Sequence, residues 1–426
     1  MNSSVPQTEA LLFSTLLQLI VIIGAARVGN SLFRRLGQPG VVGEIVTGLL
    51  LGPSLFGHFF PQTSQALFGA HASTPILIIS QIGLILLMFQ IGMDFKFAHL
   101  SNPRSARAVA AVTLASVSVP LVLGVLIGRL SAPVLAPGTA ASVYSLFFGV
   151  GLAITAVPTL GRILREYGLT RDEMGVVAIS AAAVNDVIGW LLLAGVSAYA
   201  VAGFSARHAA LQIAGLLAFV LFLWFVLRPL VERLLARYPL RQGSVPPNLM
   251  ALVICLMFAA GVCTYRLGIF AIFGGFAAGL LFHRHEEFVH AWRRQVGQFA
   301  LVFFLPVFFT FTGLRTNVLG LTTASDFTWL AVVLAAASLG KIVPVYGVAR
   351  FCGFDAPQGW ILGSLMNTRG LMELIVLNIG LDLGFVPPKV FTMLVIMAIV
   401  TTVMTGPLLK VLLPRAGHVL PHRGQD

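Results

Sequence analysis

The stretch Val177–Ala194, which reads VAISAAAVNDVIGWLLLA, sets two polar residues in the middle of an apolar segment. At about 1.5 Å of helical rise per residue, the segment is long enough to cross a hydrocarbon core roughly 30 Å thick. Asn185 and Asp186 would then lie near the bilayer centre. A carboxylate at that depth costs about 2.5–3.5 kcal/mol on insertion scales, so such acids usually mark an ion path or a proton relay. The alternative is a protonated Asp186 that is hydrogen-bonded to a neighbouring helix and serves packing alone.

The composition is that of a polytopic helical membrane protein. Of the 426 residues, 58% are hydrophobic and 10% are charged, whereas about a quarter of the residues in soluble globular domains are charged. The apolar runs are continuous and close to 20 residues long, and a helix satisfies its own backbone in lipid. We therefore expect an all-α fold, with residues 1–426 as a single integral membrane unit and residues 414–426 as a short cytoplasmic tail.

The distribution of basic residues predicts the orientation of the chain. The 27 Lys and Arg residues give a formal net charge of +12. If the N-terminus is outside, nineteen of them lie in cytoplasmic segments and five lie in outer loops. The five are Arg129, Arg207, Arg266, Arg315 and Lys389. By the positive-inside rule the N-terminus lies outside and the C-terminus in the cytoplasm, most simply in the cell (plasma or inner) membrane. The charge thus reports topology, and we expect membrane lipid and no nucleic acid as a partner.

The apolar runs between basic or Pro/Gly-rich breaks predict about 13 transmembrane helices. An odd number of spans agrees with termini on opposite sides of the membrane. The expected spans lie near 11–29, 39–59, 74–94, 106–130, 141–165, 172–202, 208–232, 247–266, 268–283, 296–314, 326–349, 357–383 and 388–413.

Two pairs of matching segments indicate an internal repeat. Gly43–Leu50 (GEIVTGLL) has glycines in register with Gly274–Leu281 (GGFAAGLL), and Met88–Met93 aligns with Phe309–Leu314. Each pair is seven spans apart, so the two units have opposite orientations, as in many secondary transporters. The expected parts are a first six-helix repeat, a linker helix and a second six-helix repeat: 1–202, 203–246 and 247–413.

The fifth and twelfth spans correspond to each other and both contain helix-breaking residues. The fifth reads GLAITAVP from Gly151 to Pro158, and the proline removes a backbone donor in mid-membrane. The twelfth reads MNTRGLME from Met366 to Glu373. We therefore expect two discontinuous helices. Interrupted helices at matching positions of two repeats are the best sequence indication of a binding site at the membrane midplane. The alternative is a simple proline kink and a polar helix end.

Four further charged residues lie within apolar spans. Lys341 is well inside the eleventh span and needs a partner, although none is evident from the sequence. Arg369 and Glu373 are spaced i, i+4 and could neutralise each other or take part in transport. Glu44 lies about one turn in from the cytoplasmic end of its span, where it can snorkel to the interface or interact with the helix dipole, so we leave it outside the site.

The expected chemistry is competition for one carboxylate. Asp186 can hold a proton or a Na⁺ or K⁺ ion, not both, and a site that faces one side at a time would couple the two fluxes. We expect no cofactor and no enzymatic activity, because the sequence contains neither a GxxxxGK[ST] loop nor an HExxH motif. The three cysteines, Cys255, Cys263 and Cys352, form no CxxC pair and are assigned no metal.

These features together resemble the monovalent cation/proton antiporters, in the branch that includes the bacterial glutathione-gated potassium efflux type and the plant cation/proton exchangers. The resemblance covers nearly the whole chain. The matching stretches are PGVVGEIVTGLLLGPSLFG (39–57), ITAVPTLGRILREYG (154–168), Asn185-Asp186, the span of Lys341 and MNTRGLMELIVLNIGL (366–381).

The resemblance implies a homodimer in which a mobile core moves like an elevator and two unwound helices cross beside the acidic pair. In that picture Asp186 binds the cation and the proton, Asn185 is its companion, and Thr155 is a further ligand. Lys341 would balance charge at the helix crossing. No nucleotide-binding regulatory domain is expected in this chain.

The chain departs from the family pattern at the pair itself. Many electrogenic relatives have two acids, whereas this chain has Asn185, and positions that carry Glu or Ser in other relatives are Ala181 and Ala182 here. One titratable acid fits one-for-one, electroneutral exchange, and the alternative is that Lys341 releases a second proton. Two other functions stay open, namely a sodium-coupled carrier that holds an organic anion with Arg369, and a passive cation channel.

Overall fold

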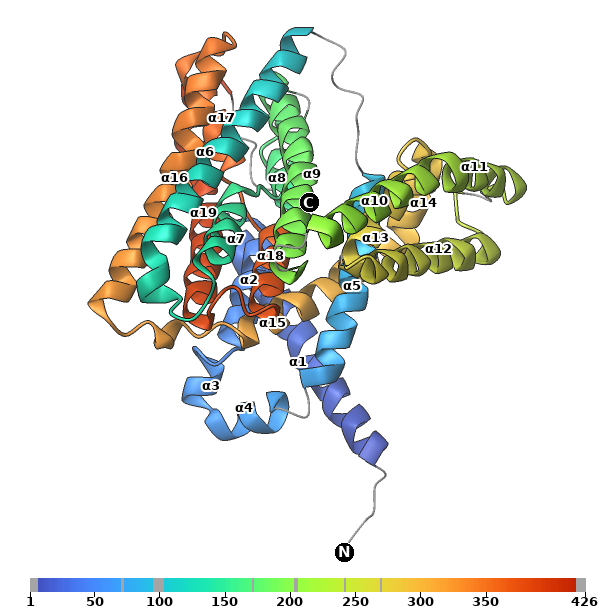
Figure 1. Ribbon diagram of the computed structural model, residues 1–426, viewed down its shortest axis with the longest axis horizontal. Helices are drawn as coiled ribbons and strands as arrows, with labels where there is room; N and C mark the ends of the chain where they lie inside the picture. Colours follow the sequence, from blue (N-terminus) through green and yellow to red (C-terminus); the bar gives the residue numbers. More distant parts are fainter. Residues whose placement is uncertain are drawn as a thin grey trace, which may run out of the picture. The chain divides into compact units, whose positions relative to one another are not determined.

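The computed structural model describes residues 7–69, 73–94, 103–170, 172–202, 206–240, 243–268 and 270–418, and within these ranges the chain is helical with no β-strand (Figure 1). In chain order the α-helices are α1 (Gln7–Arg35), α2 (Gly40–Leu50), α3 (Phe56–Phe59), α4 (Pro61–Phe68), α5 (Ser73–Met93), α6 (Pro103–Leu135), α7 (Ala141–Ala153), α8 (Val157–Glu166), α9 (Glu173–Ala202), α10 (Ala206–Phe222), α11 (Arg228–Arg237), α12 (Pro247–Arg266), α13 (Ala271–Leu280), α14 (Glu286–Trp292), α15 (Leu305–Leu314), α16 (Ala324–Phe351), α17 (Ala356–Met366), α18 (Leu371–Asp382) and α19 (Pro388–Arg415).

Nine helices in the described part of the chain are long and apolar enough to cross a membrane, and α2, α7 and α13 are shorter apolar helices. Each expected span coincides with a helix or a run of helical segments. The fifth and twelfth spans are each divided into two half-helices, as expected. The second span was predicted too long, because α2 ends at Leu50 and a turn at Gly52-Pro53 precedes α3. The expected tail lies outside the described residues from 419 onward.

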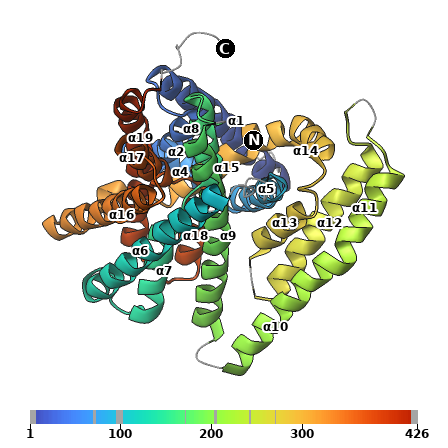
Figure 2. The ribbon, with the colours of Figure 1, turned by 90° about the horizontal axis from the view of Figure 1, so that it is seen from above.

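The chain divides into two compact units, and both expected repeats contribute to each of them. Unit 1 comprises Met1–Ala25, Phe56–Lys96 and Ser197–Phe311, and unit 2 comprises Ala26–Leu55, Phe97–Val196 and Thr312–Asp426. In unit 1, α13 packs against α5 and α12 (Figure 2). In unit 2, α6 packs along α7 and α16, and α17 packs against α16 and α19. All the residues singled out in the sequence for ion binding or charge balance lie in unit 2.

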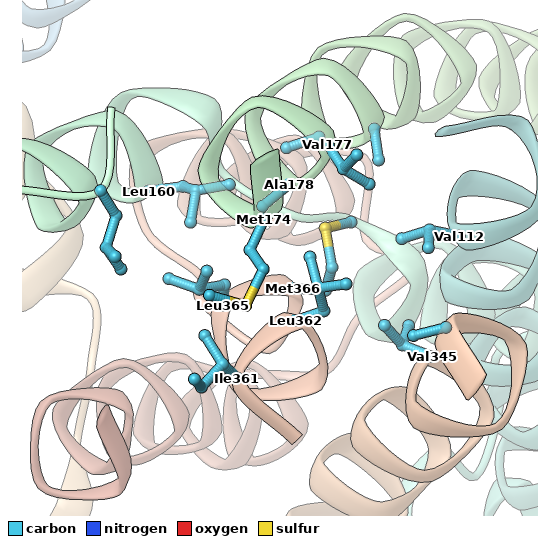
Figure 3. Packing of buried hydrophobic residues seen from close by; sticks show 14 of the residues in the cluster. Val112, Leu160, Met174, Val177, Ala178, Val345, Ile361, Leu362, Leu365 and Met366 are labelled. Carbon is cyan, nitrogen blue, oxygen red and sulfur yellow. The ribbon is translucent and has the colours of Figure 1, made fainter. Parts of the chain in front are cut away.

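The interior of unit 2 is an apolar cluster between half-helices and long helices (Figure 3). Leu160 of α8, Val177 of α9 and Leu362 of α17 point into it and are fully buried. Lipid tails are as apolar as these side chains, so helix association in a membrane depends on close packing more than on the hydrophobic effect. The cluster therefore stabilises the half-helices through close van der Waals packing of complementary side chains.

Small residues on α6 and α7 make a close helix contact in unit 2. Gly124 and Gly128 are four residues apart on α6, and they face Gly149 and Ser145 of α7. A Cβ atom added to Gly124 would lie 2.6 Å from the Cα of Gly149, and one added to Gly128 would lie 2.6 Å from the Cα of Ser145. This is the small-xxx-small packing that lets membrane helices approach closely, and it fixes the position of α7.

The repeat inferred from the glycines has a counterpart in helix contacts. Within unit 2, a Cβ atom on Gly313 of α15 would overlap the carbonyl oxygen of Gly48 of α2. Within unit 1, a Cβ atom on Gly92 of α5 would lie 3.1 Å from the Cα of Gly279 of α13. In the register of the sequence, Gly48 corresponds to Gly279 and Gly313 to Gly92. The matched contacts support the repeat, and its boundaries stay a prediction.

We predict that Gly124→Ala lowers the free energy of unfolding by about 1–3 kcal/mol, because the new methyl group would force the backbones of α6 and α7 apart. Thermal unfolding of the purified protein in detergent measures the change. Gly347→Ala on α16 is the matched control, since no atom lies within 4 Å of the position of the added Cβ. The control should be neutral or slightly stabilising through the higher helix propensity of alanine. Equal melting temperatures for the two variants would contradict the proposed contact.

Candidate functional site

Two interrupted helices meet at their breaks in unit 2. Residues Ile154–Ala156 separate α7 from α8, and Asn367–Gly370 separate α17 from α18. The backbone N–H of Ala156 donates to the carbonyl of Thr368 at 3.3 Å. The hydroxyl of Thr155 donates to the carbonyl of Met366 at 3.1 Å. Because the ends of a helix leave backbone groups without partners, the two breaks satisfy part of each other's hydrogen bonding.

Gly370 is the residue that allows the second break. Its φ of +156° lies in a region that residues with a side chain rarely adopt. A Cβ atom there would also collide with the hydroxyl of Thr159 on α8. The sequence thus places a glycine where the backbone conformation and the neighbouring half-helix both require one.

Arg369 binds the open end of α7. Its Nη1 donates to the carbonyl of Gly151 and its Nη2 to that of Leu152, each at 2.8 Å. Nη1 also lies 3.2 Å from the carboxylate of Glu373, and both side chains are fully buried. The hydroxyl of Thr402 on α19 holds the backbone of Arg369, accepting from its N–H at 3.1 Å and donating to its carbonyl at 3.0 Å. A cation at this position also complements the negative end of the half-helix dipole.

Lys341 of α16 binds the next carbonyl of the same break. Its Nζ donates to the carbonyl of Ile154 at 2.7 Å and to the hydroxyl of Thr155. The lysine is completely buried. The partner that the sequence left unidentified is therefore a pair of neutral oxygens in the break, and no direct ion pair of Lys341 with an acid is present in the described part of the chain.

Asn185 completes this hydrogen-bonding at the break. Its Nδ2 donates to the hydroxyls of Thr155 and Ser116, each at 3.2 Å, and lies 3.5 Å from the carbonyl of Ala153. The amide oxygen Oδ1 is buried and has no hydrogen-bond partner. Asn185 thus supports the break with its nitrogen and keeps its oxygen available.

Asp186 is 2% exposed, and neither of its carboxylate oxygens has a hydrogen-bond partner at bonding geometry. The backbone N–H of Val157, at the start of α8, is directed at the carboxylate as a weak hydrogen-bond donor, and the ammonium of Lys341 is near enough to act on it electrostatically. The positive end of a half-helix dipole therefore faces the carboxylate. The carboxylate of Asp186 thus lies near two positive groups, and neither makes a hydrogen bond of normal geometry with its oxygens.

The structure brings together all six residues that the sequence predicted for the site or its charge balance: Asp186, Asn185, Thr155, Lys341, Arg369 and Glu373. Their roles in transport stay predictions. Sequence reasoning missed Ser116 and Thr402, which hold Asn185 and Arg369. Hydroxyl residues in apolar helices are common, and no spacing marked these two.

The interpretation of Glu44 as a residue that snorkels to the interface was wrong. Its side chain is 3% exposed, and its Oε1 accepts from Asn30 at 2.6 Å and from Arg27 at 3.1 Å. Both donors lie on α1. Glu44 is a buried, paired acid between α1 and α2.

Known proteins resemble this chain over nearly its whole length. Residues 19–415 match the model of the family described as "Sodium/hydrogen exchanger, transmembrane". The chain is 35% identical over 412 residues to the Na(+)/H(+) antiporter NhaS4 of Synechocystis sp., a match that covers 95% of this chain and 98% of that protein. It is 36% identical over 397 residues to Cation/H(+) antiporter 17 of Arabidopsis thaliana, covering 92% of this chain and 47% of the plant protein.

A solved structure has the same fold. The sodium proton antiporter MjNhaP1 of Methanocaldococcus jannaschii superposes with a TM-score of 0.68 at 15% sequence identity, covering 94% of this chain and 97% of that chain. The all-helical architecture with two crossed, discontinuous helices is therefore that of a sodium/proton antiporter. Since the family model spans nearly the whole sequence, the chain belongs to the sodium/hydrogen exchanger family.

Proposed function

We propose that this protein is a secondary antiporter that exchanges a monovalent cation, Na⁺ or K⁺, for a proton, with Asp186 as the shared binding site. The observation that carries the proposal is a fully buried carboxylate with both oxygens unpartnered, beside the crossing of two interrupted helices. An acid in such surroundings is rarely kept for packing. The names of relatives support the choice of ions, since they include a K(+)/H(+) antiporter of Saccharomyces cerevisiae and the Na(+)/H(+)-K(+) antiporter GerN of Bacillus cereus.

Three buried oxygens without partners are available for a cation. They are both carboxylate oxygens of Asp186 and the amide oxygen of Asn185. Oxygen ligands suit hard cations such as Na⁺ and K⁺, and a carboxylate that has no competing hydrogen bond can accept a proton or a metal ion alternately. Thr155 would add its hydroxyl, which Lys341 and Asn185 share.

The exchange is proposed to be one-for-one and electroneutral. A cation on the ionised carboxylate and a proton on the same carboxylate give the site the same net charge. Lys341 binds neutral oxygens in both cases and is proposed to balance the charge of Asp186. Alternating access would then need only that the loaded site, with either ion, moves from one side of the membrane to the other.

The surroundings of Arg369 favour this function over an organic-anion carrier. Both terminal nitrogens of the guanidinium already donate to Gly151 and Leu152. A substrate carboxylate that replaced those hydrogen bonds would leave buried carbonyls unpaired, which costs about 1–3 kcal/mol for each group.

The orientation in the membrane, the oligomeric state and the movement are also part of the proposal. The uneven distribution of basic residues supports an N-terminus outside and a C-terminus in the cytoplasm of the cell membrane. A homodimer with an elevator-like movement is proposed from the resemblance to the family.

We predict that Asp186→Asn abolishes exchange and leaves a folded protein. The amide side chain fills the same volume, but it cannot ionise and so cannot bind a proton and a cation in turn. The measurement is proton flux in proteoliposomes after addition of Na⁺ or K⁺. Asp355→Asn is the matched control, since it makes the same chemical change at the exposed start of α17, where asparagine is also a good N-cap. Exchange in Asp186→Asn at the rate of the parent would refute the proposed site.

We predict that Thr155→Val reduces the rate of exchange by about tenfold or more, because the buried ammonium of Lys341 and the amide of Asn185 lose a shared acceptor. Thr155→Ser keeps the hydroxyl and should retain most of the activity. The rates come from the same flux assay, normalised to the amount of protein in the liposomes. Equal losses in the two variants would mean that the methyl group of Thr155, and not its hydroxyl, is what matters.

We predict that Arg369→Ala destabilises the protein by about 3–5 kcal/mol, as expected when one partner of a buried ion pair is removed. Two carbonyls of α7 and the carboxylate of Glu373 lose their donor. Glu373→Gln, which can still accept a hydrogen bond from Arg369, should remain folded and exchange ions. Thermal unfolding and flux distinguish the roles, and a folded Glu373→Gln variant without exchange would assign Glu373 to transport.

A further inference from the structure

The carboxylate of Asp186 borders a narrow hollow inside unit 2. The hollow is too small to hold a water molecule. Its lining consists of Ile154, Asp186, Gly189, Trp190, Met372 and Val376. Asp186 is the one charged member of the lining, and the walls around it are almost entirely apolar.

The walls come from three elements that meet at the helix crossing. Ile154 lies in the break between α7 and α8, Gly189 and Trp190 lie on α9 within about one turn of Asp186, and Met372 and Val376 lie one turn apart on α18. Ile154 is 3% exposed and Met372 is 2% exposed. On this side the carboxylate is thus covered by side chains without an oxygen atom, and the indole N–H of Trp190 is their one polar group.

Gly189 sets the width of the hollow on the side of α9. A Cβ atom at this position would lie 3.0 Å from Cγ1 and 3.5 Å from Cδ1 of Ile154. The absence of a side chain therefore lets Ile154 lie close to α9. Gly195 lies on the same helix with no atom within 4 Å of its added Cβ, so close packing is a property of position 189 and not of every glycine in α9.

Met372 is the part of the wall that can move. A methionine side chain is unbranched and has three rotatable bonds, so it can change shape at little cost. Ile154 and Val376 are β-branched and have fewer rotamers. A cation that entered the hollow would have to displace part of its lining, and Met372 is the member that can move at the lowest cost.

We propose that this apolar wall, with Met372 as its movable member, is the specificity determinant for the transported cation. The inference rests on the proposed antiport at Asp186. A cation beside these side chains finds no wall oxygens to replace its water, and the free energy of removing water from an ion increases as the ion becomes smaller. The intact wall therefore disfavours Na⁺ relative to K⁺, and space for one water molecule beside the carboxylate would reduce the difference.

The test compares the Na⁺ and K⁺ concentrations that give half-maximal proton flux in proteoliposomes at one pH. For Met372→Ala, the ratio of the Na⁺ value to the K⁺ value should fall by about threefold or more, because the shorter side chain admits water. For Gly189→Ala, the ratio should rise by about threefold or more, because the methyl group pushes Ile154 into the hollow.

Two variants serve as controls. Met372→Leu conserves the volume of the wall, and Gly195→Ala makes the same change as Gly189→Ala at an open position. Both should keep the ratio of the parent within about twofold. Size-exclusion chromatography and thermal unfolding establish that each variant is folded, and Gly189→Ala carries the test if Met372→Ala does not fold.

The possible results separate this inference from the proposal on which it depends. If the parent exchanges cations and the folded variants keep its ratio, the wall does not determine specificity and antiport at Asp186 stands. If neither cation moves protons in the parent, the antiport proposal fails and the assignment of the wall fails with it.

Discussion

The end of α7 inside the protein is the constraint on which the rest of the site depends. A helix that stops in a membrane exposes carbonyl groups that lipid cannot satisfy. Here the four consecutive carbonyls from Gly151 to Ile154 all lie beside side-chain nitrogens. Arg369 donates to the first two and Lys341 to the fourth, while the amide nitrogen of Asn185 lies 3.5 Å from the third. These donors make it possible for the helix to end inside the membrane. Their positions then determine where an acidic side chain can lie beside the break.

The same interruption sets the charge balance of the site. With all four groups ionised, Lys341 and Arg369 offset Asp186 and Glu373, so the empty site has no net charge. A bound cation or a bound proton adds one positive charge in either case. In the proposed exchange, this equality is a physical reason why one carboxylate could serve two ions, and it follows from having Asn185, not a second acid, beside Asp186.

The sequence predicted much of this arrangement because charges in apolar segments are conspicuous. Asp186, Lys341, Arg369 and Glu373 stand out for that reason, and Pro158 and Gly370 indicated where the helices break. The partner of Lys341 could not be predicted, since Thr155 is 186 residues away and only packing brings the two together. Ser116 and Thr402 are hydroxyls of a kind that usually bonds within its own helix. Glu44 was misplaced because depth along one span does not reveal that α1 covers it.

The network also limits how Asp186 can move. The groups that hold the crossing come from different helices of unit 2: Ser116 on α6, Asn185 on α9, Lys341 on α16 and Thr402 on α19. Separating the half-helices would break hydrogen bonds to buried charged groups, each with a net contribution of about 1.5–3 kcal/mol. A movement that carries these helices together would keep every bond. The energetics therefore support the proposed elevator-like movement, in which a body that includes the crossing would move as one and local adjustment would be confined to flexible side chains such as Met372.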